Sequence, residues 1–458
     1  MATQGRSKLF GTDGVRGEAN AGAMTVENAV QIGRAIGVLC ARSSRHERPR
    51  VLIGKDTRRS GYLFENALVA GLCSVGADSY LVGPLPTPGI AFMCVGMRAD
   101  AGVVISASHN PFGDNGIKVF GADGFKLPDE LEAQIEDWVA NPQPLLAGLA
   151  RGLDIGRAHR VDDAWGRYTV KLKTTLANDL TLDGLKIAVD AGHGAAYKVA
   201  PMVFEELGAE VVLLNGRPDG VNINEGCGAL HPEGLARAVV ENGCQLGVAL
   251  DGDADRLVLV DEKGRVVDGD HTMALCATRM KAQGTLKGNT VVATVMSNYG
   301  FEIALREAGI DVLRTDVGDR LVVEAMRRGG FNLGGEQSGH LVFLDHATTG
   351  DGVLAALQVL GILQREQRPL SELAAVMQTV PQVLINLAVR DKPPIQSLPA
   401  VAGIIGEVER ELVGQGRVLV RYSGTERKCR VMVEGRDAGQ VRAHATRIAD
   451  SVVAAIGA

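Results

Sequence analysis

Three copies of one template place the strongest limit on how this chain can fold. Each copy is a short segment rich in β-branched residues, an amphipathic helical segment, a glycine-containing turn and a second strand-like segment. The copies lie at 50–83, 185–216 and 289–319. Strands alternating with helices of this length favour right-handed βαβ units and a mostly parallel sheet. The sequence therefore predicts three related α/β domains.

A further apolar strand follows each copy and ends abruptly in polar residues. The three junctions read AGVVI then SASHNP, LGVAL then DGDADR, and FNLGG then EQSGH. Open α/β sheets bind ligands at the carboxyl ends of their strands, where loops are free of packing duties. We therefore expect Ser108, the aspartates of DGDADR and Glu336 to occupy equivalent places in three domains that face one cleft.

Ser108 and His109 raise the alternative of a hydrolase in which the histidine activates the serine. Neighbouring residues on an extended chain point to opposite faces, so we expect His109 not to serve as the base of a catalytic triad. Both side chains could also be ordinary loop hydrogen-bonding groups.

The DGDADR loop carries three carboxylates at alternate positions, Asp251, Asp253 and Asp255. It resembles the start of an EF-hand calcium loop, but Arg256 stands at the sixth place, where that turn requires glycine. A solvated turn is a second alternative. Mg²⁺ fits the pattern better than calcium, because it takes hard oxygen ligands and commonly one from a phosphate.

The region from residue 378 departs from the template. A Pro-rich connector precedes a helix-like segment, a strand-loop-strand at 418–435 and a closing helix, which together predict a smaller α+β domain. Its RYSGTE loop suits a phosphate, because guanidinium groups and backbone N–H groups bind phosphate oxygens, although the same residue types also build plain turns. The predicted domains are 1–160, 161–264, 265–377 and 378–458.

Composition excludes several classes of function. The chain has 48 Lys and Arg against 54 Asp and Glu, a formal net charge of −6, which argues against a nucleic-acid partner. The seven cysteines are widely spread with no C-x-x-C pair, as expected of free thiols in a reducing cytoplasm. No apolar run approaches the length of a membrane span, so we expect a soluble cytoplasmic protein.

Nine motifs in this order resemble the α-D-phosphohexomutase family, and within it the bacterial phosphoglucosamine mutases. They span nearly the whole chain: FGTDGVRG, GKDTRRSG, GPLPTP, SASHNPFGDNGIK, GVNIN, DGDADR, VGDR, GEQSGH and RYSGTE. The resemblance implies four domains around a central cleft, a serine that carries a phosphoryl group and one Mg²⁺. The implied reaction interconverts glucosamine 6-phosphate and glucosamine 1-phosphate through a 1,6-bisphosphate. A homodimer is compatible with the resemblance.

The resemblance also assigns roles by position. Ser108 is then the phosphoserine, and it shares the metal ion with Asp251, Asp253 and Asp255. Lys118 and Arg16 are cations beside the transferring phosphoryl group, and His109 adjoins it as a further catalytic residue. The implied substrate-binding residues are Arg256, Gly318, Asp319, Glu336, Ser338, Arg421, Ser423, Gly424, Thr425 and Arg430.

Three positions depart from the family pattern. Ala254 stands where glycine is common, Arg427 and Lys428 replace the usual proline, and Leu321 replaces a frequent aromatic residue. None removes a ligand, but Ala254 bears on how closely the metal loop can pack. Rival interpretations are a phosphomannomutase or phosphoglucomutase, a Mg²⁺-dependent sugar phosphatase with Asp251 as nucleophile, and a non-catalytic sugar-phosphate sensor.

Overall fold

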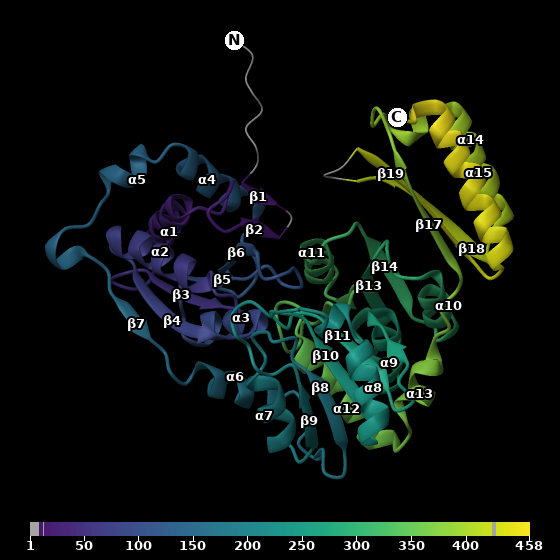
Figure 1. Ribbon diagram of the computed structural model, residues 1–458, viewed down its shortest axis with the longest axis horizontal. Coiled ribbons are helices and arrows are strands. Elements are labelled where there is room, and N and C mark those ends of the chain that lie inside the picture. The colour runs from purple at the N-terminus through teal and green to yellow at the C-terminus, as the bar shows by residue number, and fades with distance from the viewer. Residues whose placement is uncertain (1–8, 12, 424–426) are drawn as a thin grey trace. The chain divides into compact units, whose positions relative to one another are not determined.

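The computed structural model describes residues 9–11, 13–423 and 427–458. The chain divides into two compact units (Figure 1). The first contains the described residues up to Val295 together with Ile310–Ala375, and the second contains Met296–Gly309 and Val376–Ala458. Each unit is described by itself.

The three sheets of the first unit share one topology. In each, the first strand of the template lies between the second and a third strand, both parallel to it, and a fourth strand runs antiparallel beside the third. The strands are β3 (Arg50–Lys55), β4 (Asp78–Pro84), β5 (Ala101–Ile105) and β6 (Asp114–Gly121); β8 (Lys186–Asp190), β9 (Glu210–Leu214), β10 (Leu246–Leu250) and β11 (Leu257–Asp261); and β13 (Thr290–Thr294), β14 (Asp311–Thr315), β15 (Leu333–Gly335) and β16 (Leu341–Phe343). The prediction of three related α/β sheets is confirmed.

Additional strands make the first two sheets larger than the third. Two antiparallel strands extend the first sheet beside β6, a parallel strand extends it beside β4, and one antiparallel strand extends the second sheet beside β11. These are β1 (Phe10–Gly11), β2 (Gly14–Glu18), β7 (Ala158–Arg160) and β12 (Val266–Val267).

The helices of the first unit lie between its strands in sequence, except for the last two, which follow its last strand. They are α1 (Val26–Ala41), α2 (Gly61–Ser74), α3 (Thr87–Gly96), α4 (Asp129–Ala140), α5 (Gln143–Ala147), α6 (Ala164–Lys173), α7 (Val199–Glu206), α8 (Glu233–Asn242), α9 (Gly269–Ala282), α11 (Asp319–Gly329), α12 (Gly352–Glu366) and α13 (Leu370–Leu373). The contact of α1 with α2 depends on glycine: a Cβ on Gly71 would lie 2.2 Å from the Val30 carbonyl oxygen. The two helix backbones therefore approach more closely than larger residues would permit.

The strands that precede the predicted loops are fully buried. Every residue of β5, β10 and β15 is buried. Strands covered on both faces consist of nearly continuous apolar residues, as AGVVI and LGVAL do. The polar loops that follow are thus attached to strands packed on both faces.

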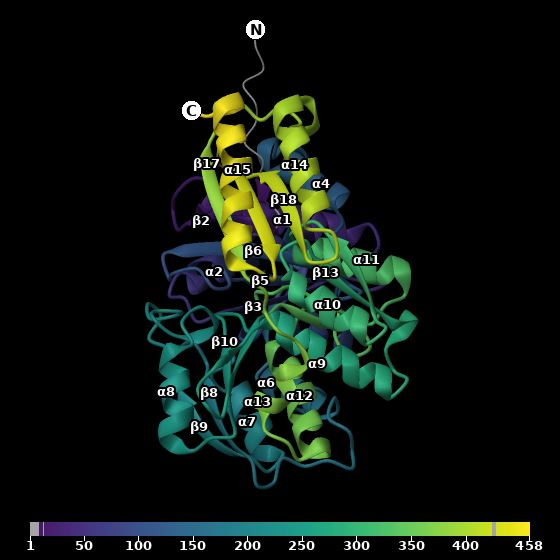
Figure 2. The ribbon, with the colours of Figure 1, turned by 90° about the vertical axis from the view of Figure 1, so that its right-hand side faces the viewer.

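The second unit is the smaller α+β part, as predicted. It contains α10 (Tyr299–Glu307), β17 (Gln382–Ala388), α14 (Pro399–Glu411), β18 (Gly416–Tyr422), β19 (Lys428–Gly435) and α15 (Ala438–Ile456). The sheet has the antiparallel order β17-β19-β18, and α14 and α15 lie side by side along one face of it (Figures 1 and 2). Val431, Val433 and Ile448 belong to the core between sheet and helices.

Strand β17 was absent from the sequence-based prediction, which placed only a connector before the helix of this part. Its burial alternates between exposed and half-buried residues, which is the period of a strand with one face on the protein. The strand forms because its whole length pairs with β19, from Gln382 opposite Glu434 to Ala388 opposite Lys428. Such long-range pairing leaves only a weak local signal.

Helix α10 is fixed to this unit through its N-cap. Asn298 donates from Nδ2 to the Val380 carbonyl oxygen (3.1 Å) and to Oε1 of Glu434 (3.1 Å), and its Oδ1 accepts from the Val380 N–H (3.0 Å). Buried amides require such partners. The grouping of 296–309 with the C-terminal residues therefore has a hydrogen-bonded basis.

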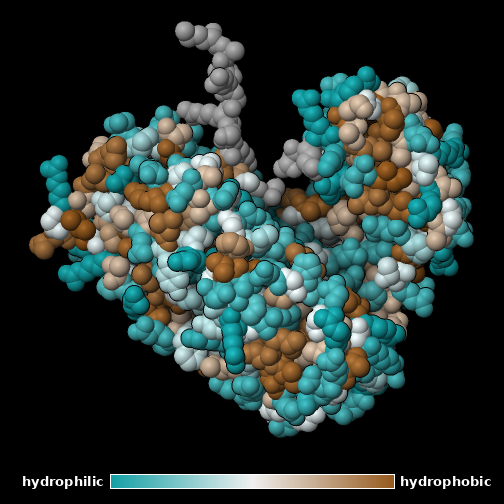
Figure 3. All heavy atoms as spheres, in the orientation of Figure 1, coloured by the Kyte–Doolittle hydropathy of each residue, from teal (hydrophilic) through white to brown (hydrophobic). Residues whose placement is uncertain are grey.

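The face of the molecule drawn in Figure 3 is mostly hydrophilic, with separate hydrophobic patches. Among the described residues, none of the helices combines the length and the apolar character that a membrane span needs.

Candidate active site

Three hairpin loops carry the proposed nucleophile, metal ligands and sugar-binding residues. The β5–β6 loop carries Ser108, the β10–β11 loop carries the three aspartates, and the β15–β16 loop carries Glu336 and Ser338. Each loop leaves the third strand of its sheet and returns as the antiparallel fourth strand. The loops therefore occupy equivalent positions in the three sheets.

Ser108 is held in an unusual backbone conformation. Its φ of 52° lies in the left-handed region, which L-residues other than glycine rarely adopt. Its N–H donates to Oγ of Ser106 (2.9 Å), and the Ser106 hydroxyl donates to Oδ2 of Asp56 (2.7 Å). All three residues are buried, so the hydroxyl of Ser108 has a fixed place at the end of β5.

Two side chains that the sequence analysis did not single out hold the Ser108 carbonyl. Arg58 donates from Nη2 to the carbonyl oxygens of Ser108 (3.0 Å) and Asn110 (2.7 Å). Asn224 donates from Nδ2 to the same two oxygens at 2.9 and 3.1 Å. They lie in the quoted motifs GKDTRRSG and GVNIN, so the motifs marked the residues without revealing what they contact.

The expectation that Ser108 and His109 point apart is wrong. His109 Nδ1 lies 3.3 Å from Ser108 Oγ, because Ser108 is in the left-handed region and the chain there is not extended. Burial, aided by the positive charge of Arg256, lowers the pKa of His109 to about 4. The imidazole is therefore neutral at pH 7.

The three aspartates form a compact buried group. Their carboxylate oxygens lie within 4.8 Å of one another, and Oδ2 of Asp251 accepts a 2.6 Å hydrogen bond from the Ser108 hydroxyl. Oδ2 of Asp253 accepts from the Thr87 hydroxyl (2.7 Å). The Oδ1 atoms of Asp253 and Asp255 are buried without a hydrogen-bond donor. Buried carboxylate oxygens without donors are the hard ligands that Mg²⁺ requires, so the residues fit this ion.

The pKa values of Asp251 and Asp255 are shifted in opposite directions. Burial, with the charges of Asp255 and Asp253, raises the pKa of Asp251 well above its usual value. Burial also opposes ionisation of Asp255, but the charge of Lys118 and the nearby imidazole of His340 outweigh it and lower the pKa of Asp255. A cation placed among the three carboxylates would remove this repulsion.

Ala254 occupies the tight turn between two of these aspartates. It is fully buried with φ of 56°, again in the left-handed region. This explains why glycine is common here in the family that the sequence resembles. The turn nevertheless accepts the Cβ of alanine, and the aspartates on both sides stay within the group.

Lys118 is the cation of the group. Its Nζ lies 3.1 Å from Oδ2 of Asp253, 3.6 Å from Oδ2 of Asp255 and 3.2 Å from Oδ2 of Asp13. Burial opposes its charge, but these carboxylates raise the pKa of Lys118 above its usual value. Arg16 pairs with the same Asp13, so both predicted cations belong to one charge network beside Ser108.

The sugar-binding candidates of the third sheet also lie together. Glu336 accepts from the Gly318 N–H at Oε1 (3.3 Å) and from the Ser338 hydroxyl at Oε2 (3.2 Å). Asp319 follows as the first residue of α11. The charge of Glu336, after those of Asp255 and Asp251, offsets the burial of Arg256 and helps to raise the pKa of that guanidinium.

The remaining candidates belong to the second unit. Arg421 on β18 and Arg430 on β19 are directly opposite each other in the antiparallel register. Two like charges in such positions repel unless an anion lies near them. Ser423 is buried at the end of β18, where its carbonyl oxygen accepts from Lys392 Nζ (2.6 Å). Gly424 and Thr425 lie outside the described residues.

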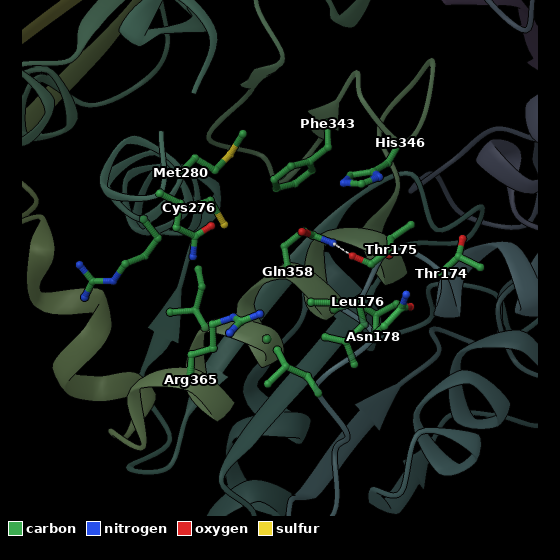
Figure 4. Close-up of a pocket in the computed structure, with 17 residues that line it drawn as sticks. Thr174, Thr175, Leu176, Asn178, Cys276, Met280, Phe343, His346, Gln358 and Arg365 are labelled. Atoms are coloured by element: carbon green, nitrogen blue, oxygen red, sulfur yellow. Dashed lines mark hydrogen bonds between the residues drawn. The ribbon is translucent and has the colours of Figure 1, made fainter. Parts of the chain in front are cut away.

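A separate cavity of about 370 Å³ opens between α9, α12 and the segment 174–180 (Figure 4). Cys276, Met280 and Phe343 line it, and Gln358 Nε2 donates to the Thr175 carbonyl oxygen (3.1 Å). None of the predicted site residues belongs to its lining.

Comparison with known proteins relates four regions of the chain to described domains. Residues 7–144, 166–264, 268–380 and 384–451 match, in this order, the alpha/beta/alpha domains I, II and III and the C-terminal domain of phosphoglucomutase/phosphomannomutase. A phosphoglucosamine mutase of Geobacter sp. (strain M21) is 59% identical over 451 residues, which cover 98% of each chain. One of Anaeromyxobacter sp. (strain Fw109-5) is 60% identical over 453 residues, 98% of this chain and 96% of the relative.

Solved structures show the same fold at lower sequence identity. A phosphoglucomutase/phosphomannomutase family protein from Burkholderia thailandensis superposes with a TM-score of 0.80 and 24% identity over 98% of this chain and 97% of that chain. N-acetylphosphoglucosamine mutase of Aspergillus fumigatus, in complex with GlcNAc-6P and magnesium, gives a TM-score of 0.67 at 18% identity over 99% and 97%. Likeness at these identities concerns the fold alone.

Proposed function

Because this chain belongs to the phosphoglucomutase/phosphomannomutase family and matches phosphoglucosamine mutases over nearly its whole length, we propose that it interconverts glucosamine 6-phosphate and glucosamine 1-phosphate. The enzyme is then an isomerase of the intramolecular phosphotransferase type, and its product would feed the synthesis of UDP-N-acetylglucosamine. The observation that carries the proposal is the 2.6 Å contact of the Ser108 hydroxyl with a buried carboxylate group.

The proposed reaction uses Ser108 in both directions. The phosphoryl group on Ser108 Oγ passes to the free hydroxyl of the monophosphate: the bond from phosphorus to Oγ breaks and a bond from phosphorus to the sugar oxygen forms. The resulting 1,6-bisphosphate reorients and returns its other phosphoryl group to Oγ. The proton lost by the sugar hydroxyl in the first transfer is regained by the product in the second, so the serine is regenerated as phosphoserine.

Asp251, Asp253 and Asp255 would hold one Mg²⁺ together with an oxygen of the Ser108 phosphate, since they fit that ion. When bound, Mg²⁺ stabilises negative charge on the phosphoryl oxygens. The buried oxygens of Asp253 and Asp255 that lack donors support this assignment.

Cationic side chains of the protein would supply the remaining stabilisation of negative charge during phosphoryl transfer. Phosphoryl transfer has a loose transition state, so alignment and charge stabilisation supply most of the catalysis. Lys118 and Arg16 are the proposed cations, and their position around Asp13 supports this role. His109 is neutral at pH 7, and its Nδ1 lies 3.3 Å from Ser108 Oγ, whose own proton is donated to Asp251.

The sugar-binding residues would have to accept the intermediate in two orientations. Glu336 and Ser338 would bind sugar hydroxyls, and Gly318 and Asp319 would form the turn against which the sugar lies. Their support is the contact of Glu336 with both Gly318 and Ser338. Arg256, held near Asp255, would complete this group.

Arg421, Ser423, Gly424, Thr425 and Arg430 are the proposed ligands of the phosphate that is not transferred. The two arginines in register on β18 and β19 support this, because guanidinium groups on directly opposite residues can bind the oxygens of one phosphate.

We also propose the domain limits 1–160, 161–264, 265–377 and 378–458. The four matched regions support this division.

All seven cysteines are free thiols, which supports a place in the cytoplasm. The proposed partners are small hexosamine phosphates, and a homodimer stays a prediction.

The function is tested by supplying purified enzyme with glucosamine 6-phosphate and a trace of the 1,6-bisphosphate, and following both monophosphates by ³¹P NMR. Glucose and mannose phosphates serve as competitors, because a phosphoglucomutase or phosphomannomutase would prefer them. Release of inorganic phosphate without interconversion would instead indicate the phosphatase. Intact mass should show one phosphoryl group, which Ser108→Ala removes.

A further inference from the structure

Lys126 connects two parts of the site that belong to different sheets. Its Nζ lies 2.6 Å from Oδ1 of Asp13 and 2.5 Å from Oδ2 of Asp319. Only 12% of its side chain is exposed. Asp13 precedes β2 of the first sheet, and Asp319 opens α11 beside the third sheet. One nearly buried ammonium therefore bridges two carboxylates whose charges repel each other.

The bridge closes a ring of charged and polar side chains. Beyond Asp13 the ring continues to Lys118 (3.2 Å) and on to Asp255 (3.6 Å). Beyond Asp319 it continues to His340 Nε2 (3.8 Å), whose Nδ1 lies 3.7 Å from the same Asp255. All three sheets contribute to this ring, which connects the metal loop, the Ser108 cations and the sugar-binding turn.

The chain around Lys126 is fixed to the third sheet by a second set of contacts. Arg320, next to Asp319, donates from Nη2 to the Leu127 carbonyl oxygen (2.9 Å) and to Oε1 of Glu132 (2.8 Å). The Thr348 hydroxyl donates to the Gly124 carbonyl oxygen (2.6 Å). These contacts attach the segment 124–132 to Arg320 and Thr348, and they hold Lys126 close to Asp319.

We propose that Lys126 is a positioning residue. It holds the sugar-binding turn at Gly318 and Asp319 at a fixed place relative to the phosphoryl-transfer group around Ser108 and Lys118. Asp13 and Asp319 both accept from it, so its ammonium fixes their separation. Lys126 would act through these carboxylates and would not touch the phosphoryl group. The assignment rests on the proposed function, and it adds a residue to which that function gave no role.

Loss of the ammonium has a definite physical consequence. Two carboxylates would face each other in a partly buried setting, with Lys118 and Arg16 left on one side and His340 on the other. A buried charge without its partner is costly, so the sugar-binding turn should move away from Asp13. The sugar would then be presented poorly to Ser108, although Ser108 and the aspartates keep their own contacts.

The test compares Lys126→Met, which keeps the aliphatic stem, with Lys126→Arg, which keeps the charge. The matched control is Lys55→Met, because Lys55 at the end of β3 pairs with Glu65 on α2 in a buried ion pair that involves neither Asp13 nor Asp319. The readouts are kcat and KM for glucosamine 6-phosphate, the melting temperature, and hydrogen exchange of the backbone amides at 316–321.

Lys126→Met should lower kcat/KM by about 10-fold to 100-fold, the range of one charge-assisted hydrogen bond, with a higher KM and faster exchange at 316–321. Lys126→Arg should recover most of both effects. Lys55→Met should lower the melting temperature without raising KM or changing that exchange. Combining Lys126→Met with Asp319→Asn should cost far less than the product of the two single losses, because both act through one contact.

Two results would overturn the assignment. One is unchanged KM and unchanged exchange at 316–321 in Lys126→Met. The other is a loss of activity that only parallels the fall in melting temperature. In that case Lys126→Arg would be no more active than Lys126→Met, and the double variant would show the product of the two single losses. Failure of the wild-type enzyme to interconvert glucosamine phosphates would reject the proposed function instead, and the exchange measurement, which needs no substrate, would still decide whether Lys126 positions the turn.

Discussion

The Ser108 hydroxyl donates a 2.6 Å hydrogen bond to Oδ2 of Asp251, although 143 positions separate the two residues in sequence. Each lies in the hairpin loop that follows the third strand of its own sheet. Equivalent loops of two related sheets thus supply the nucleophile and the first of the carboxylates beside it.

Ser108→Ala should abolish interconversion while leaving the fold intact, because the hydrogen bond to Asp251 is lost but the alanine fits the place of the serine. The measurements are turnover by ³¹P NMR and thermal melting. Ser106→Ala is the matched control: it should keep measurable turnover but lower the free energy of unfolding by about 1–3 kcal/mol, because buried Asp56 loses its donor. Near-normal turnover of Ser108→Ala would reject the phosphoserine role.

Asp253→Asn should weaken activation by Mg²⁺, since one of three anionic ligands becomes neutral. The Mg²⁺ concentration for half-maximal rate measures this, with Asp261→Asn as a control, because Asp261 is a buried aspartate that caps the turn after β11. An unchanged Mg²⁺ dependence in Asp253→Asn would argue strongly against the three aspartates as ligands.

Ala254→Gly should leave stability unchanged or raise it, because glycine adopts the left-handed conformation without the cost of about 1 kcal/mol that alanine carries. The control is Ala249→Gly in β10, which removes an equally buried methyl from a regular strand and should lower the free energy of unfolding by about 1 kcal/mol. Equal losses in the two variants, measured by urea unfolding, would show that the turn stores no strain.

Arg421→Ala should raise KM for the monophosphate and lower turnover, with a combined loss of about 10-fold to 100-fold. It should also release more free 1,6-bisphosphate, since a loosened intermediate escapes before its second transfer, while phosphorylation of Ser108 survives. Arg417→Ala is the control on the same strand, because Arg417 pairs with Glu434. Wild-type constants and wild-type bisphosphate release would exclude Arg421 as a phosphate ligand.

Asp351 should make stability fall as the pH rises. Burial raises its pKa to about 6, so the folded protein keeps a proton there that the unfolded chain, with a pKa of about 3.9, has already lost. Its contribution is complete below about pH 4 and is lost as the pH rises through about 6, a change of roughly 3 kcal/mol. Urea unfolding at pH 4.5 and 7 should show a smaller decrease for Asp351→Asn, in which this group cannot ionise. Equal decreases in the free energy of unfolding of the wild type and Asp351→Asn would contradict the raised pKa of Asp351.

The sequence was sufficient for the repeats, because strand and helix periodicity are local and each copy carries its own pattern. It also placed Ser108, the three aspartates and Glu336 at strand ends, where a parallel sheet exposes loops. Strand β17, whose alternate residues Val383, Ile385 and Leu387 pack against the core of the second unit while its length pairs with β19, was missed.

The contacts between the site residues depend on the tertiary structure. Nothing local indicated that Ser108 would be left-handed, and so its contact with His109 contradicted an argument based on an extended chain. Nor could spacing show that Lys126 bridges Asp13 to Asp319. Local periodicity determines which residues leave a sheet, whereas electrostatic partners depend on how whole sheets pack, since charges act through space and are indifferent to separation along the chain.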